Sequence, residues 1–348
     1  MGKVRYSDEK YLCEYDLSVD FFESLGLDVI DLWPNRNIYV LDTKQGKKIL
    51  KMIEYPIARL DFICRSIDYI KKDYPYILNI NTLPNGDKYI NWKNKTYILM
   101  DLIEGMECDV ANPIELERTA KAIALMHKAS DGFLTTLSNK EIMNNLGNYY
   151  LEKKFDEDKR ALLKFKEDVL SFKYKNEFDE IFINNVDRNI KKIDFCIDLL
   201  KNSKYYSLWN NNNYIVASHN DLAYHNIIIR DNKVYFIDFD YLKIDIRAKD
   251  ISDFIIKTIK RFGFSVEMCD SIICNYDKVS RLTKEELELF FNYVTYKAKM
   301  ITTYKPKLDD NISKELTALF SEICFSHNLD TIKKNINNHY FCIVTINN

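Results

Sequence analysis

The segment from 218 to 254 holds the residues whose types and spacing best suit catalysis. It reads SHNDLAYHNIIIRDNKVYFIDFDYLKIDIRAKDISDF, and His219, Asp221, Asn226, Asp238 and Asp240 stand between its short apolar runs. Polar groups at the ends of apolar strands are held rigidly, which is how many sites are built. Carboxylate and amide oxygens are ligands that Mg²⁺ prefers while it also binds phosphates. These residues therefore suit a magnesium–nucleotide complex.

Short strands are the elements that must position these residues. We expect strands at 214–217, 226–230 and 234–238, the last two joined by the tight turn Asp231-Asn232-Lys233. Asp221 comes before this hairpin and Asp238 ends it, so the hairpin should bring both carboxylates to the same edge.

A zinc site is an alternative for part of this segment. His219, Asp221 and His225 are all residue types that bind zinc. However, His225 and Asn226 are neighbours on an incipient strand, so their side chains should point to opposite faces.

The first hundred residues predict strands with one helix inserted. Strands are expected at 37–41, 47–52, 77–80, 88–91 and 96–101, and an amphipathic helix at 58–72. After Gly105 the pattern becomes helical, with helices expected at 114–130, within 141–203 and from 249 onward. Thr283 and Glu286 form a capping-box pattern at the start of one of them.

Composition narrows the class of protein. The 348 residues are 47% hydrophobic and 29% charged, enough for two packed domains or one unusually large domain. Fifty basic against 52 acidic residues give a net charge of −2, which disfavours nucleic acid as a partner. No apolar run approaches the roughly 20 residues of a membrane span, and the charged start does not resemble a signal peptide. We therefore expect a cytoplasmic protein without a membrane partner, and reduced thiols at its eight scattered cysteines.

A family resemblance follows from the motif. His219-x-Asp221-x₄-Asn226, followed by Ile237 to Asp240, resembles the catalytic and metal loops of aminoglycoside phosphotransferases and choline kinases, small-molecule relatives of protein kinases. The runs VYFIDFDYLKIDIRAKDI and LMHKAS (125–130) resemble, more narrowly, the CotS-type spore coat branch. This implies an α+β, two-lobed protein kinase-like fold. Its parts would be an N-lobe of five strands and one helix (1–101), a hinge (102–105) and a mostly helical C-lobe with the catalytic hairpin (106–348).

The resemblance also implies roles for the motif residues. Asp221 would orient the acceptor hydroxyl and accept its proton, and His219 and Asp250 would support its loop. Asn226 and Asp238 would bind magnesium, and Asp240 would reach a second magnesium or its waters.

Further roles are implied in the N-lobe and the hinge. Lys51 would hold the α- and β-phosphates of ATP. Its carboxylate partner would be Asp61 or Asp68 on the 58–72 helix, with Asp68 favoured by spacing. The backbone of Asp101 and Ile103 would bind adenine. The phosphate-covering loop around 33–37 lacks the G-x-G-x-x-G of protein kinases.

The resemblance thus implies an ATP- and Mg²⁺-dependent phosphotransferase that acts on a small-molecule hydroxyl. The alternative is a non-catalytic component of the bacterial spore coat with the same fold. As a member of this branch, the protein would reside in the mother-cell cytoplasm, with deposition in the coat and other coat proteins as partners.

Overall fold

The computed structural model describes residues 17–35, 38–147, 149–259, 261–262 and 265–289. The chain divides into two compact units. The first unit joins the residues up to Glu107 with Ile227–Asp240, and the second joins Cys108–Asn226 with the residues from Tyr241 onward. The limits proposed above for the lobes and the hinge stay predictions.

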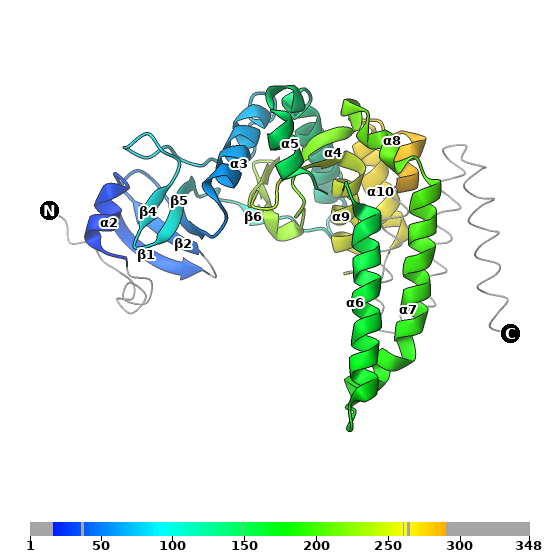
Figure 1. Ribbon diagram of the computed structural model, residues 1–348. Coiled ribbons are helices and arrows are strands. Elements are labelled where there is room, and N and C mark those ends of the chain that lie inside the picture. The colour runs from blue at the N-terminus through cyan, green and yellow to red at the C-terminus, as the bar shows by residue number, and fades with distance from the viewer. Residues whose placement is uncertain (1–16, 36–37, 148, 260, 263–264, 290–348) are drawn as a thin grey trace. The chain divides into compact units, whose positions relative to one another are not determined.

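An antiparallel sheet of five strands forms the centre of the first unit (Figure 1). Its strands are β1 (Val29–Asn35), β2 (Ile38–Thr43), β3 (Lys48–Ile53), β4 (Ile90–Trp92) and β5 (Lys95–Asp101), in the order β1-β2-β3-β5-β4. Helix α2 (Val19–Ser24) contributes Phe21 and Phe22 to a buried cluster with Leu50, Tyr97 and Leu99 of the sheet. Burial of these large apolar side chains holds the helix against one face of the sheet.

One predicted strand in this unit was wrong and one observed strand was not predicted. Residues 77–80 form only isolated bridges, Ile77 with Phe236 and Ile80 with Met100. The first strand of the sheet is instead β1, whose polar residues and Pro34 obscured it in the sequence. Proline is tolerated there because β1 is an edge strand. The phosphate-covering loop was expected around 33–37, but residues 33–35 belong to β1. Residues 36 and 37 lie outside the described residues, so the role of this turn stays a prediction.

Helix α3 (Ile57–Ile70) follows β3 directly. Its apolar face buries Leu60, Ile63, Ile67 and Ile70, as the three- and four-residue spacing predicts. The predicted amphipathic helix is confirmed, with its end two residues earlier than expected.

The predicted hairpin is confirmed as β8 (Ile227–Arg230) and β9 (Lys233–Phe236). Ile227 pairs with Phe236, so the open end of the hairpin lies at these two residues. Strand β6 (Met106–Glu107) pairs with β8, which gives a small three-stranded sheet. The hydroxyl of Tyr74 donates to the carbonyl of Val234 at 2.6 Å and links the hairpin to the rest of the first unit.

The second unit is mostly helical. Its helices with both ends described are α4 (Pro113–Ala129), α5 (Asn139–Asn145), α6 (Leu151–Ser171), α7 (Glu177–Asn202), α8 (Tyr205–Trp209), α9 (Arg247–Ile259) and α10 (Val266–Asp277). The 3₁₀ turns are Phe133–Thr136, Asn212–Tyr214 and Tyr224–Asn226. Strand β7 (Ile215–Ser218) pairs antiparallel with β10 (Lys243–Ile246). The long helices α6 and α7 run side by side (Figure 1).

Side-chain contacts confirm the predicted helix start near 283. The Thr283 backbone N–H donates to Glu286 Oε2 at 2.9 Å, and the Glu286 N–H donates to Thr283 Oγ1 at 3.3 Å. These reciprocal bonds are those of a capping box. Among the described helices, none combines the length and apolarity needed to cross a membrane.

Candidate active site

Lys51 lies on β3 and forms two ion pairs within the first unit. Its Nζ is 2.8 Å from Asp238 Oδ1 and 2.7 Å from Asp240 Oδ2. Burial by itself lowers the pKa of a lysine, but here the two carboxylates outweigh it and the pKa of Lys51 is raised. The ammonium is therefore firmly charged, as an anion-binding lysine must be.

The carboxylates on Lys51 are not the one that the sequence favoured. Asp68 is exposed on α3, and so is the other candidate, Asp61. The two positions are seven residues apart and thus share one helix face, opposite the apolar face that packs inward. The predicted pairing of Lys51 with Asp68 is therefore corrected to Asp238 and Asp240.

The turn after β9 gives Asp238 and Asp240 their common direction. Asp238 has a left-handed backbone with φ of 63°, and Phe239 between the two acids is buried. Such a φ is uncommon outside glycine and persists only where the surroundings enforce it. Because both carboxylates reach one ammonium, their oxygens converge on one point, a geometry that suits a divalent cation with oxygen ligands.

Two residues that the sequence did not suggest bind Asp240. Tyr55 lies just before α3, and Arg59 lies in its first turn. The Tyr55 hydroxyl donates to Asp240 Oδ1 at 3.1 Å, and Arg59 Nη2 donates to the Asp240 carbonyl at 3.1 Å. Burial, followed by the charge of Asp240, raises the pKa of Tyr55. Their four-residue spacing next to a helix start was the available signal, but it does not name a partner so distant in sequence.

Asp221 lies in the second unit with both carboxylate oxygens engaged. Asn226 Nδ2 donates to Asp221 Oδ2 at 3.0 Å and to the Asp221 carbonyl at 2.9 Å. Lys257 Nζ on α9 lies 2.5 Å from Asp221 Oδ1. The carboxylate is thus fixed in direction while its side chain stays 30% exposed, which leaves room for a reactant.

A buried carboxylate, Asp250, supports the loop that carries Asp221. Its two oxygens accept the backbone N–H groups of His219 at 2.8 Å and Asn220 at 2.9 Å. His127 Nε2 lies 3.0 Å from the same group, and His127 Nδ1 is 2.8 Å from the Tyr276 hydroxyl. Burial raises the pKa of a carboxyl, but the bonds from His127 and the nearby charges hold the pKa of Asp250 below its usual range.

The loop itself has a strained turn at Asn220. Its φ is 61°, and its side-chain oxygen accepts a hydrogen bond from the buried Lys249. His219 Nδ1 accepts the backbone N–H of Asp221 at 3.2 Å. Within the part of the chain that the structure describes, no cluster of three or more His, Cys, Asp or Glu could hold a metal ion, so the zinc alternative has no support there.

The two residues expected at the adenine site lie at the end of β5. The Asp101 carboxylate accepts bonds from Lys48 at 2.5 Å, Asn79 at 2.9 Å and Asn81 at 3.1 Å. Burial opposes ionisation, but these three bonds lower the pKa of Asp101. Ile103 is half-buried just beyond the strand.

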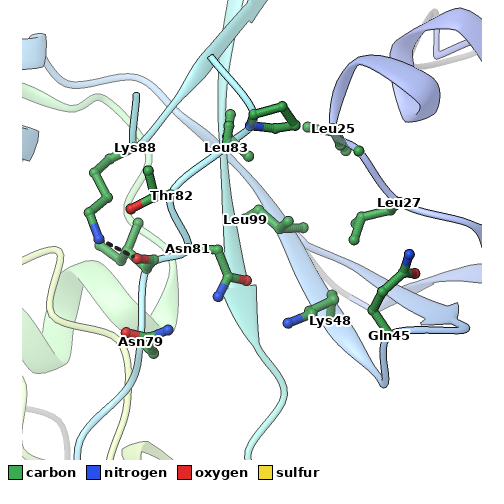
Figure 2. A pocket seen from close by; sticks show the side chains of 13 residues that line it. Leu25, Leu27, Gln45, Lys48, Asn79, Asn81, Thr82, Leu83, Lys88 and Leu99 are labelled. Atoms are coloured by element: carbon green, nitrogen blue, oxygen red, sulfur yellow. Dashed lines mark hydrogen bonds between the residues drawn. The ribbon is translucent and has the colours of Figure 1, made fainter. Parts of the chain in front are cut away.

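A cavity of about 500 Å³ lies on the other face of the sheet (Figure 2). Lys48 and Leu99 line it together with Leu27, Gln45 and Asn81. Lys48 and Lys51 are an odd number of positions apart on β3, so their side chains point to opposite faces. This cavity therefore does not belong to the group around Lys51.

The chain is similar to known proteins both in sequence and in structure. Residues 106–332 match the family model described as choline/ethanolamine kinase, which is more than half of the chain. Among solved structures, an aminoglycoside phosphotransferase from Alicyclobacillus acidocaldarius superposes with a TM-score of 0.71 at 14% identity, over 86% of this chain and 94% of that one.

Two further structures are similar. Spectinomycin phosphotransferase in an AMP-bound complex has a TM-score of 0.63 at 14% identity, over 89% of this chain and 94% of that one. Amicoumacin kinase, solved with AMP-PNP and Ca²⁺, has a TM-score of 0.57 at 12% identity, over 91% of this chain and 94% of that one. At such identities the likeness establishes the fold alone. The chain has the predicted two-lobed, protein kinase-like α+β fold.

Proposed function

Because the chain belongs to the choline/ethanolamine kinase family, a family of small-molecule kinases, we propose that it transfers the γ-phosphoryl group of ATP to a small-molecule hydroxyl, with Mg²⁺ as cofactor. The observation that carries this proposal is the exposure and orientation of the Asp221 carboxylate. Its carboxylate is part-exposed and oriented through both oxygens, by Asn226 and Lys257. That is what a group must be to orient an attacking hydroxyl.

The reaction forms one bond and breaks one. The acceptor oxygen bonds to the γ-phosphorus, the bond from that phosphorus to the β,γ-bridging oxygen breaks, and ADP leaves with the electron pair. The hydroxyl proton passes to Asp221 and from there to water. Since the transition state of phosphoryl transfer is loose, positioning and charge neutralisation supply most of the acceleration.

The remaining roles follow the motif residue by residue. Asp238, Asp240 and Asn226 would hold Mg²⁺, which when bound neutralises charge on the phosphates. Lys51 exchanges its two carboxylates for the α- and β-phosphates when the nucleotide binds. The backbone of Asp101 and Ile103 binds the adenine. The pairing of two carboxylates with Lys51 supports these roles, because it gathers the required charges of both signs.

The acceptor class is a hydroxyl compound that also carries amine or sugar groups. This rests on the family and on the solved relatives, one of which is a spectinomycin phosphotransferase crystallised with ADP and spectinomycin.

Turnover of labelled ATP tests the proposal. The wild-type chain should form ADP with at least one of choline, ethanolamine and an aminoglycoside panel, and only when Mg²⁺ is present. Asp221→Asn should lower kcat by roughly 100-fold or more, since it removes the proton acceptor. Asp231→Asn is the matched control, because Asp231 is 91% exposed in the β8–β9 turn. Wild-type protein that neither binds nor turns over Mg–ATP would contradict the proposal.

The CotS-like branch gives the finer proposal, a kinase-fold protein of the spore coat. The runs 234–251 and 125–130 support it through their resemblance to that branch. Its strongest form is a non-catalytic coat component that binds other coat proteins. Spores in which the Asp221→Asn protein is incorporated and the coat assembles normally would favour this structural role, whereas a defective coat would favour catalysis.

A further inference from the structure

The loop that carries Asp221 has no cation of its own. From His219 to Asn226 it contains neither lysine nor arginine. Its carboxylate is nevertheless bound by one, Lys257 of α9, with Nζ 2.5 Å from Oδ1. The two side chains are 29% and 30% exposed, so this ion pair sits at an accessible surface and is not part of the core.

Helix α9 positions Lys257 next to Asp221, because α9 and the residues after it contact the Asp221 loop at several points. Asp250 in the first turn binds the backbone N–H groups of the loop. Lys257 follows seven residues later and therefore lies on the same helix face, two turns further on. Just beyond α9, the guanidinium of Arg261 lies 4.1 Å from the centre of the Tyr224 ring, which belongs to the same loop. The spacing of Lys257 from Asp250 was visible in the sequence, but its partner was not.

A carboxylate without a nearby cation would be repelled by the negative charge of a reacting triphosphate. Like charges at a few ångströms repel strongly where water is partly excluded. The reaction proposed above requires the Asp221 carboxylate, the acceptor oxygen and the transferring phosphoryl group to approach one another. A cation on Asp221 removes much of that repulsion and keeps the free oxygen lone pairs pointed at the acceptor.

We propose that Lys257 is a positioning residue for phosphoryl transfer, which holds Asp221 through Oδ1 and neutralises its charge as the phosphoryl group arrives. The inference rests on the proposed function. Holding the carboxylate in one direction lets Asp221 orient the acceptor hydroxyl, which suits a reaction whose rate depends mostly on positioning and charge neutralisation.

The test measures ADP formation and Mg–ATP binding in the full-length chain, with the best acceptor found above or with water as acceptor. Lys257→Ala should lower kcat by roughly 10- to 100-fold while KM for ATP changes by less than about 3-fold, because the lost interaction acts during transfer. Lys257→Arg should retain much of the rate, and ethylammonium added to Lys257→Ala should restore part of it. Lys201→Ala is the control, since Lys201 forms an exposed ion pair with Glu152 in the same unit.

Three results separate the possible failures. A Lys257→Ala chain with a kcat within 2-fold of wild type would overturn the inference, and so would a loss that neither arginine nor ethylammonium restores. In both cases the wild-type protein still forms ADP, so the proposed function stands. Wild-type protein that forms no ADP overturns the proposed function itself, and the role of Lys257 with it.

Discussion

Asp250 is the residue that holds the backbone of the loop carrying Asp221. It is fully buried, yet it carries a negative charge that two backbone N–H groups and His127 satisfy. A buried charge is tolerable only when it is hydrogen-bonded on all sides. Burying this charge is unfavourable, and its hydrogen bonds fix the backbone directly before Asp221. The position of that backbone is therefore strongly constrained.

Asp250→Asn should therefore destabilise the fold by about 2–4 kcal/mol at pH 7, because an amide puts an N–H group where the loop offers only donors. Urea unfolding followed by circular dichroism measures this. Asp187→Asn, at an exposed ion pair with Lys166, should cost less than about 0.5 kcal/mol.

The stability difference between wild type and Asp250→Asn should also depend on pH. The folded-state pKa of Asp250 is depressed below the ordinary 3.8, so its contribution is fully present well above that pH and is lost as the pH falls below it. The difference between wild type and Asp250→Asn should stay constant from pH 7 to about pH 5 and shrink below about pH 4. A difference that grows on acidification would contradict this assignment.

Among the elements, the pairing of β6 with β8 depends on a glycine. Gly105 has a φ of 156°, and a Cβ there would lie 2.5 Å from Ile228 Cγ2 and 2.7 Å from the Ile229 carbonyl oxygen. Gly105 ends the predicted hinge and leads directly into β6. The close approach to the β8 backbone therefore fixes how the chain leaves the five-stranded sheet.

Gly105→Ala should destabilise the protein by about 2–4 kcal/mol, because the methyl group meets both backbone and a buried side chain. Gly46→Ala is the matched control. Its φ of 98° is also strained for alanine, but nothing lies within 4 Å of the added Cβ, so its cost should be only about 1 kcal/mol. Equal losses in urea unfolding would show that strain alone, and not the contact with β8, makes glycine necessary.

Across the whole chain, what the sequence could predict was local. The hairpin around Asp231-Asn232, helix α3 and the capping box of Thr283 follow from spacing over a few residues, and each is confirmed. The fold class could be predicted because the motif from His219 to Asp240 is itself compact in sequence. The order of strands was less accessible, since β1 has no regular apolar alternation.

The partners of the charged residues could not be predicted. Lys51 meets Asp238 and Asp240, which are 187 and 189 positions away, and Lys257 meets Asp221 across 36 positions. A helix pattern tells which face a residue occupies, but it does not tell what packs there. The choice of Asp68 failed for this reason: spacing suggested a partner on α3, whereas both partners lie in the turn after β9, and Asp68 is on the exposed face of α3.

Linkage between nucleotide binding and folding separates an active kinase from a scaffold that binds nothing. A ligand at 100 times its Kd stabilises the fold that binds it by about 2.7 kcal/mol, which should raise Tm by roughly 4 °C for a chain of this size. Mg–ATP should produce this shift in wild type and in Asp221→Asn, because the role proposed for Asp221 is in transfer and not in binding. Lys51→Met should lose most of the shift, since it removes the cation proposed for the phosphates. Lys44→Met, at an exposed pair with Asp28, controls for lysine loss in the same unit and should keep it. A full shift in Lys51→Met would contradict the role proposed for Lys51, and a wild-type protein without a shift would favour the coat component.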